Sequence, residues 1–272
     1  MADFKKITEQ PSLYDHLEQM EVGELLDNIN REDQKVALAV REAIPAIERL
    51  VEEMEPRFLS GGRLFYIGAG TSGRLGILDA SEIPPTYGMP HDRVIGLIAG
   101  GDRAIRKAVE HAEDDPQQAW KDLSAHGINP MDTLVGIAAS GTTPYVIGGV
   151  QKAREEGILT AGLTNNPGSP LARASEIPIE VPVGPEFVTG STRMKSGTSQ
   201  KLVLNMITTA LMVRIGRVQG NKMVHMQLSN NKLIDRGTRY LVEHLRLSYE
   251  EAGVALKKYG SVKNALEALK GQ

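Results

Sequence analysis

The sequence contains no cysteine. This absence excludes disulfide bonds, thiolate nucleophiles and cysteine-ligated metal sites, and it fits a reducing compartment. Aromatic residues are also scarce, at 4% of the chain, and Trp120 is the single tryptophan. We therefore expect Trp120 to pack within the fold rather than to form a stacking platform for a planar ligand.

Long hydrophobic runs and a basic stripe are missing as well. The most apolar stretch, residues 202–213, is interrupted by Asn205 and two threonines and is too short to span a bilayer. The residues that follow Met1 soon become polar, so a secretory signal is not indicated. Lysine and arginine are scattered and the formal net charge is -3, whereas nucleic-acid binding needs a concentrated basic face. We expect a cytoplasmic protein that binds neither membranes nor nucleic acid.

Histidines at metal-ligand spacing are absent too. The six histidines form no pattern such as H-x-x-x-H, and cysteine partners are missing, so no metal site is predicted. We expect these histidines to lie at the surface or to be satisfied within the fold. They are His16, His91, His111, His126, His225 and His244.

Residues 34–56 are predicted to form a helix, because apolar residues recur there at spacings of three and four along one face. Pro45 lies inside this pattern and is expected to kink the helix. We assign residues 1–56 to an N-terminal helical arm. The apolar face consists of Val40, Ile44, Ile47, Val51 and Met54.

After Gly61-Gly62, short apolar runs alternate with helical stretches, two of them at residues 102–114 and 144–157. This alternation predicts an α/β fold, a parallel sheet with helices on both faces. From Arg193 onward the chain is predicted to be helical, with a break at Tyr259-Gly260. We expect a main domain over residues 57–220 and a small C-terminal helical region over 221–272. The predicted strands are residues 64–67, 94–99, 133–139, 158–163 and 177–183.

Three segments are rich in glycine and hydroxyl side chains: residues 68–74, 139–144 and 189–195. The first two follow predicted strands and open predicted helices, where unpaired backbone N–H groups and the helix dipole favour an anion. The carboxyl ends of the strands are also where open α/β sheets bind ligands. One such loop alone could be an ordinary turn. Two at equivalent positions favour a sugar-phosphate pocket.

The first loop also matches G-x-G-x-x-G through Gly68, Gly70 and Gly73. A dinucleotide site would need an acidic residue about 20 positions further on, at the end of the second strand. The first acid there is Asp102, well beyond that spacing. A Walker-type Gly-Lys-Ser/Thr is also missing, which argues against hydrolysis of nucleoside triphosphates.

Glu82 and Glu113 are candidate catalytic carboxylates. Glu82 follows the first loop, and Pro84-Pro85 is expected to end the helix there, while Glu113 is expected at the end of the helix after the second strand. Two carboxylates in one pocket can divide general-acid and general-base work. A single glutamate on a helix is more often solvated, and sequence spacing does not bring these two together.

Several segments resemble the signature motifs of N-acetylmuramic acid 6-phosphate etherases, a family with the sugar-isomerase (SIS) fold. The resemblance extends over roughly residues 7 to 240 and is dense. The segments are Ile7–Glu9, Gly68–Pro85, Gly96–Gly101, Ala108–Asp114, Gly136–Tyr145, Asn166–Ser169 and Val188–Asn205.

The resemblance implies a SIS-type three-layer sandwich and a homodimer. It also implies cleavage of the D-lactyl ether of a phosphorylated amino sugar, N-acetylmuramic acid 6-phosphate, without metal or organic cofactor. The products would be N-acetylglucosamine 6-phosphate and D-lactate. The two catalytic glutamates of the family match Glu82 and Glu113. The implied substrate-binding residues are Gly70, Thr71, Ser72, Arg74, Ser81, Ser140, Thr142, Thr143, Asn166, Glu186, Ser191, Arg193 and Lys195.

Following the family, we assign Glu82 as the acid at the ether oxygen and Glu113 as the base at carbon 2. Two other functions remain open at this point. One is a sugar-phosphate sensor, as in the related glucokinase regulatory protein, and the other is an aldose–ketose isomerase of the same fold. Release of lactate from the muramic substrate separates the three, because only the etherase produces it.

Overall fold

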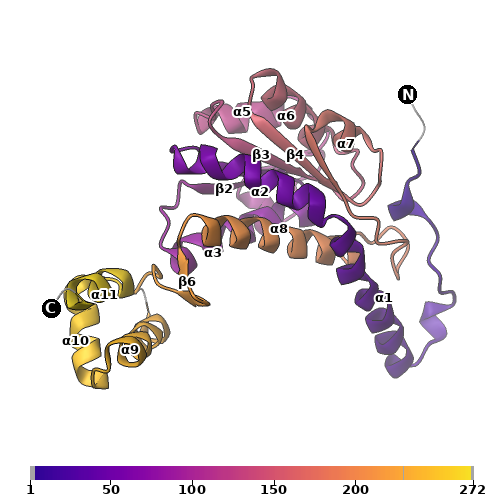
Figure 1. Ribbon diagram of the computed structural model, residues 1–272. Coiled ribbons are helices and arrows are strands. Elements are labelled where there is room, and N and C mark those ends of the chain that lie inside the picture. Colours follow the sequence, from indigo (N-terminus) through magenta and orange to yellow (C-terminus); the bar gives the residue numbers. More distant parts are fainter. Residues whose placement is uncertain (1–3, 229, 271–272) are drawn as a thin grey trace. The chain divides into compact units, whose positions relative to one another are not determined.

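The computed structural model describes residues 4–228 and 230–270. The chain forms two compact units. The first consists of Met1–Ala80 with Val94–Thr208, and the second of Ser81–Arg93 with Thr209–Gln272. The first unit has the predicted α/β architecture, a parallel sheet flanked by helices (Figure 1).

The sheet of the first unit has five parallel strands in the order β2-β1-β3-β4-β5. β1 pairs with β2 on one side and with β3 on the other, so the direction of winding reverses between β1 and β3. In open α/β sheets this switch point is where a crevice for ligands forms. All five predicted strands are confirmed. They are β1 (Leu64–Gly68), β2 (Val94–Ile98), β3 (Thr133–Ile137), β4 (Leu159–Thr164) and β5 (Ile177–Glu180).

Successive residues of β1 face opposite helical layers. Gly76 of α3 (Gly70–Tyr87) lies so close to Tyr66 that an added Cβ would be 2.9 Å from the Tyr66 Cβ. A Cβ on Gly149 of α6 (Pro144–Glu155) would lie 2.6 Å from the Cδ1 of Ile67. The pleat therefore places α3 and α6 on opposite faces. On the α6 side, α5 (Gln118–Ala125) and α7 (Pro170–Ala174) complete the layer (Figure 1). Trp120 packs in this layer, as predicted.

The helix predicted over residues 34–56 is two helices, α1 (Val22–Glu42) and α2 (Ile44–Leu59). They meet at Ala43, because Pro45 in the first turn of α2 lacks the N–H that would continue α1. The predicted apolar face is buried except for Ile44, which is 43% exposed at the junction. Two short 3-10 turns, Ile7–Glu9 and Leu17–Gln19, precede α1.

The helix predicted over residues 102–114 is wrong. Only α4 (Arg103–Arg106) is helical, and the chain then continues in turns. The side chain of Val109 folds back onto the end of β2, where a Cβ on Gly100 would lie 2.8 Å from it. Packing against the sheet therefore replaced the expected helix, and Glu113 lies in a turn.

The prediction that Pro84-Pro85 ends a helix is also wrong, because α3 continues to Tyr87. The two prolines lack N–H donors, but their carbonyl oxygens are paired, with the N–H of Gly88 at 2.9 Å and that of Gln227 at 3.3 Å. The chain turns away at Gly88, which has a φ of +64°.

The C-terminal part of the second unit is a two-stranded hairpin followed in the sequence by a small helical bundle. Its helices enclose an apolar core that includes Tyr240, Leu256 and Val262. The predicted break at Gly260 is confirmed, with a left-handed φ of +75°. Within the described residues, none of the helices is both long and apolar enough to cross a bilayer. The elements are α8 (Lys195–Arg214), which begins in the first unit, β6 (Val218–Gln219), β7 (Lys222–Met223), α9 (Asn231–Leu245), α10 (Tyr249–Tyr259) and α11 (Val262–Lys270).

Candidate active site

The first two glycine- and hydroxyl-rich loops flank the switch point of the sheet. The ends of β1 and β3 are neighbours, with Gly68 in register with Ile137. The loop after β1 opens α3 at Gly70, and the loop after β3 opens α6 at Pro144. Both loops follow strands and open helices, as the sequence predicted, and the structure shows that they start from adjacent strand ends. The first N–H groups of α3 have no acceptor in their own helix and are available to an anion.

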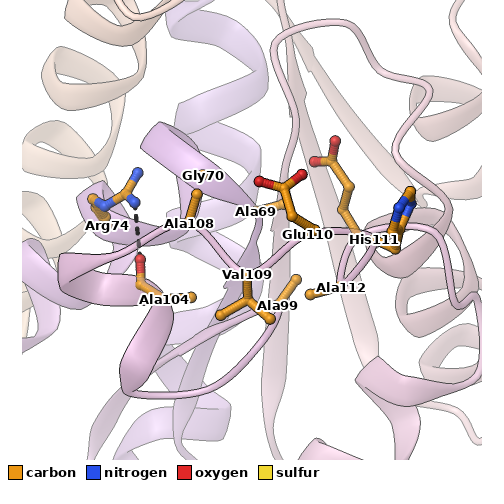
Figure 2. A pocket seen from close by; sticks show the side chains of 11 residues that line it. Ala69, Gly70, Arg74, Ala99, Ala104, Ala108, Val109, Glu110, His111 and Ala112 are labelled. Atoms are coloured by element: carbon orange, nitrogen blue, oxygen red, sulfur yellow. Dashed lines mark hydrogen bonds between the residues drawn. The ribbon is translucent and has the colours of Figure 1, made fainter.

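A cavity of about 230 Å³ lies at the start of α3 (Figure 2). Three of the predicted site residues, Gly70, Arg74 and Glu113, contribute to its wall. Gly70 has a φ of +52°, and an added Cβ there would meet no other atom within 4 Å. The remaining lining residues are Ala69, Ala99, Ala104, Ala108, Val109, Glu110, His111 and Ala112.

Arg74 holds the segment that carries Glu113. Its Nε donates to the carbonyl oxygen of Ile105 at 2.8 Å, and its Nη2 donates to that of Ala104 at 2.9 Å, the bond drawn in Figure 2. The guanidinium keeps further N–H groups beside the cavity, since only Nε and Nη2 make these bonds. Arg74 can therefore fix the shape of the cavity and still meet an anion.

Glu113 lies in an exposed turn that is anchored by its backbone. Its carbonyl oxygen accepts a hydrogen bond of 3.0 Å from the N–H of Tyr145 in the first turn of α6. His111 has a left-handed φ of +59°, so the chain reverses just before Glu113. Glu110 also lines the cavity, so the choice of Glu113 as the catalytic carboxylate rests on the family resemblance.

Ser140 organises the second loop. Its Oγ accepts hydrogen bonds from the N–H of Thr142 at 3.2 Å and from the Thr142 hydroxyl at 2.9 Å. Gly141 has a φ of +66°, and a Cβ there would lie 2.1 Å from the Oγ of Ser169. The Thr143 side chain makes no capping bond to α6. The half-buried hydroxyls of Ser140, Thr142 and Thr143 are therefore the groups of this loop that could meet a ligand.

At the start of α3, Ser72 and Thr71 lie against α8. The Ser72 hydroxyl donates to Oε1 of Gln200 at 2.9 Å, and a Cβ on Gly197 would be 3.4 Å from the Thr71 methyl group. Gln200 is 1% exposed, and its Nε2 is buried without a hydrogen-bond partner. The sequence analysis did not select Gln200, whose only local signal is a polar residue before the apolar run of α8.

The third loop, residues 189–195, leads into α8, and a carboxylate of the protein itself binds the first N–H groups of that helix. Glu186 is fully buried, and its carboxylate accepts hydrogen bonds from the backbone N–H groups of Lys195 and Ser196 at 2.8 and 2.9 Å. This anion takes the place at the helix N-terminus that a phosphate would occupy. Ser191 is half-buried and Arg193 is exposed.

Lys195 is buried in an ion pair. Its Nζ lies 2.6 Å from Oε2 of Glu32 on α1, and the two side chains are 2% and 3% exposed. Burial raises the pKa of Glu32, but hydrogen bonds from Lys195, Lys35 and Tyr14 outweigh it and lower that pKa overall. The charge of Lys195 is thus already compensated inside the protein.

Asn166, another residue predicted to bind the substrate, is also hydrogen-bonded to protein groups. Its Oδ1 accepts from the N–H of Thr8 at 3.1 Å. Its Nδ2 donates to the Thr8 hydroxyl at 2.9 Å and to the carbonyl oxygen of Ser140 at 3.0 Å. The N-terminal segment therefore reaches the second loop through Asn166.

Ser81 and Glu82 lie on α3 but belong to the second compact unit. Both residues are exposed. The cavity described above is lined only by residues of the first unit. The roles of Ser81 and Glu82 therefore stay predictions.

Asp79 is a buried carboxyl that the sequence analysis did not select. Its Oδ2 accepts from the Tyr66 hydroxyl at 3.1 Å and its Oδ1 from the Thr208 hydroxyl at 3.2 Å. Burial raises the pKa of Asp79 to about 6, against these two hydrogen bonds, which lower it. Among the residues that the structure describes, no group of three or more His, Asp or Glu side chains could hold a metal ion.

Family models and solved structures show what this chain is similar to. Residues 43–154 match the glucokinase regulatory protein N-terminal SIS domain, and residues 105–210 match the SIS domain. The phosphoheptose isomerase structure from Neisseria gonorrhoeae superposes with a TM-score of 0.53 at 19% identity, covering 73% of this chain and 100% of that one. These matches confirm the predicted SIS fold.

Much closer relatives exist at the level of sequence. A Porphyromonas gingivalis protein named N-acetylmuramic acid 6-phosphate etherase is 64% identical over 267 residues, which cover 98% of this chain and 97% of that protein. A Bacteroides fragilis protein of the same name is 63% identical, with 98% and 95% covered.

Proposed function

Because this chain belongs to the family of N-acetylmuramic acid 6-phosphate etherases, which are carbon–oxygen lyases, we propose that it cleaves the D-lactyl ether of N-acetylmuramic acid 6-phosphate. The products are N-acetylglucosamine 6-phosphate and D-lactate. The observation that carries the proposal is a cavity with a carboxylate, Glu113, on its wall and the opening turn of a long helix at Gly70.

The first step is an elimination from the open-chain sugar. The aldehyde at carbon 1 acidifies the proton on carbon 2, and the Glu113 carboxylate takes that proton. The electrons of the broken C–H bond form a double bond between carbons 2 and 3, and the bond between carbon 3 and the lactyl oxygen breaks. Protonated Glu82 gives its proton to the departing oxygen, so that neutral alcohol rather than alkoxide leaves.

The second step is hydration of the unsaturated aldehyde. Glu82, now ionised, takes a proton from a water molecule whose oxygen adds to carbon 3. Glu113, now protonated, exchanges its carboxyl proton with solvent and then gives a proton to carbon 2. Both carboxyl groups thereby regain their starting states, and the net change is the addition of one water to the substrate.

The phosphate is proposed to bind at the switch point of the sheet. The first-turn N–H groups of α3 and the Arg74 guanidinium supply fixed donors and positive charge. The hydroxyls of Ser140, Thr142 and Thr143 add donors from the neighbouring loop. Lys195 and Glu186 are not included among the phosphate-binding groups, because each is buried and already bonded to a protein group.

The sensor and isomerase functions are less well supported. The relatives at 63–64% identity over almost the whole chain are named etherases. The isomerase structure is similar only in fold, at 19% identity. A homodimer and a cytoplasmic location are part of the same proposal and follow from the family resemblance and the sequence.

An assay for D-lactate tests the proposal. Purified protein incubated with N-acetylmuramic acid 6-phosphate should release D-lactate in equal amount to N-acetylglucosamine 6-phosphate. In D₂O the sugar product should carry deuterium at carbon 2, and in ¹⁸O-water the label should enter the hydroxyl on carbon 3 and not the lactate. Binding without lactate would indicate the sensor, and conversion to a ketose would indicate the isomerase.

A further inference from the structure

Thr8 and Asn166 lie 158 positions apart in the chain and form a closed pair of hydrogen bonds. The backbone N–H of Thr8 donates to Oδ1 of Asn166 at 3.1 Å, and Nδ2 of Asn166 donates back to the Thr8 hydroxyl at 2.9 Å. Both residues are completely buried. The pair thus joins the segment before α1 to the end of β4.

The carboxamide of Asn166 has no hydrogen left for a ligand. An asparagine Nδ2 carries two hydrogens. One is donated to the Thr8 hydroxyl and the other to the carbonyl oxygen of Ser140 at 3.0 Å. Asn166 therefore acts on a substrate through Ser140, and Thr8 fixes the direction in which that amide points.

The Ser140–Gly141 peptide is held at both ends: the N–H of Gly141 donates to the carbonyl oxygen of Ala138 at 3.0 Å, and the carbonyl oxygen of Ser140 accepts from Asn166. The carbonyl oxygens on either side of it, those of Ala139 and Gly141, accept from the backbone N–H groups of Asn165 and Leu171, each at 3.0 Å. The carbonyl of Ser140 is instead held by a side chain, that of Asn166. The Ser140 hydroxyl in turn accepts from the N–H of Thr142, so the bond from Asn166 helps to hold the residue whose side chain organises the loop.

We propose that Thr8 is a positioning residue of the sugar-phosphate site, which acts by holding Asn166 and, through it, the hydroxyl loop at Ser140. The inference rests on the proposed function in taking a sugar phosphate as the ligand. Thr8 itself touches no substrate. Its loss should therefore weaken capture of the phosphorylated sugar and leave the chemical step nearly unchanged.

Thr8→Val removes the hydroxyl and keeps the shape of the side chain, and Thr8→Ser keeps the hydroxyl. Thr160→Val is the matched control, since Thr160 is also fully buried but accepts a bond from the N–H of Glu176 instead. The Kd for N-acetylglucosamine 6-phosphate is measured by calorimetry, and KM and kcat by lactate release. We expect Thr8→Val to raise Kd and KM about three- to tenfold with kcat within about twofold, the scale of one lost hydrogen bond. Thr8→Ser and Thr160→Val should resemble the wild type.

A double-mutant cycle adds a readout that general destabilisation would not change. If Thr8 acts through Asn166, Thr8→Val should raise Kd much less in an Asn166→Ala background than in the wild type. An unchanged Kd for Thr8→Val, an equal rise for Thr160→Val, or additive effects would overturn the inference. A wild type that binds the probe but releases no lactate would overturn the proposed function alone, and one that does not bind the probe would overturn both.

Discussion

The backbone N–H of Tyr145 donates a hydrogen bond of 3.0 Å to the carbonyl oxygen of Glu113. Tyr145 is itself fully buried, and its hydroxyl donates to Oδ2 of Asp122 at 2.8 Å. Because Tyr145 opens α6 directly after the second loop, this bond joins the turn that carries a candidate catalytic carboxylate to the loop that carries the hydroxyls. The two parts of the site are therefore positioned by one helix end.

Replacing the proposed acid and base should abolish most of the activity. We expect Glu113→Gln and Glu82→Gln each to lower kcat by at least about 100-fold, the scale of a lost general acid or base, while the protein stays folded. Lactate release measures the effect, and circular dichroism checks the fold. Glu110→Gln is the matched control in the same cavity and should stay within about threefold of the wild type. Near wild-type lactate production by Glu82→Gln and Glu113→Gln would show that other residues carry the chemistry.

Removing hydroxyls from the loops should weaken phosphate capture. We expect Ser140→Ala and Ser72→Ala to raise KM about three- to tenfold with little change in kcat, because a ground-state contact is lost. The Ser72 variant acts through Gln200, whose Oε1 loses its donor at 2.9 Å. Steady-state kinetics on phosphorylated and dephosphorylated substrate provide the test. Equal wild-type activity on both substrates would contradict a phosphate site here.

Breaking the buried ion pair of Lys195 and Glu32 should cost far more stability than breaking the pair of Glu32 with the half-exposed Lys35. Lys195→Met leaves Glu32 without its buried partner, and we expect the free energy of unfolding to fall by about 3 kcal/mol. Lys35→Met removes a lysine that is 51% exposed and pairs with the same carboxylate, and it should cost less than about 1 kcal/mol. Urea denaturation measures both changes. Equal losses would contradict the importance of burial.

Asp79 should make the protein less stable as the pH rises. Its pKa is about 6 in the folded protein against 3.8 as the ordinary value. The folded state thus binds the proton more tightly, so this contribution is full below about pH 4 and is lost as the pH rises through 6. Because of this titration, the free energy of unfolding should be about 2 kcal/mol lower at pH 7 than at pH 4.5. In Asp79→Asn the free energy of unfolding should change less between these two pH values than in the wild type. An unchanged difference would show that Asp79 titrates normally.

Much of the fold could be predicted because the signals are local. Buried parallel strands appear as short apolar runs that end in glycine, and the runs at 64–67 and 94–99 became β1 and β2. The two hydroxyl-rich loops were recognisable as helix openings because each directly follows such an apolar run in the sequence. Pro45 predicted a kink in one helix, and the structure has a junction of two helices there, since proline lacks the N–H that a continuous helix requires.

Where the sequence pointed in the wrong direction, long-range contacts were decisive. Residues 102–114 have a composition compatible with a helix, but Val109 packs on Gly100 and Tyr145 binds the backbone of Glu113, and these contacts favour turns. Pro84 and Pro85 resemble a helix stop, yet α3 continues because their carbonyl oxygens find partners further along the chain.

The sequence by itself determined the architecture and the chemical character of the site, since apolar periodicity, glycine positions and hydroxyl-rich turns are properties of neighbouring residues. Only the tertiary structure decided which polar groups are already hydrogen-bonded or ion-paired within the protein. Asn166 meets Thr8 across 158 positions and Lys195 meets Glu32 across 163, separations that no local pattern encodes. Because most buried polar groups find a hydrogen-bond partner, these distant contacts fix which side chains remain available to a ligand.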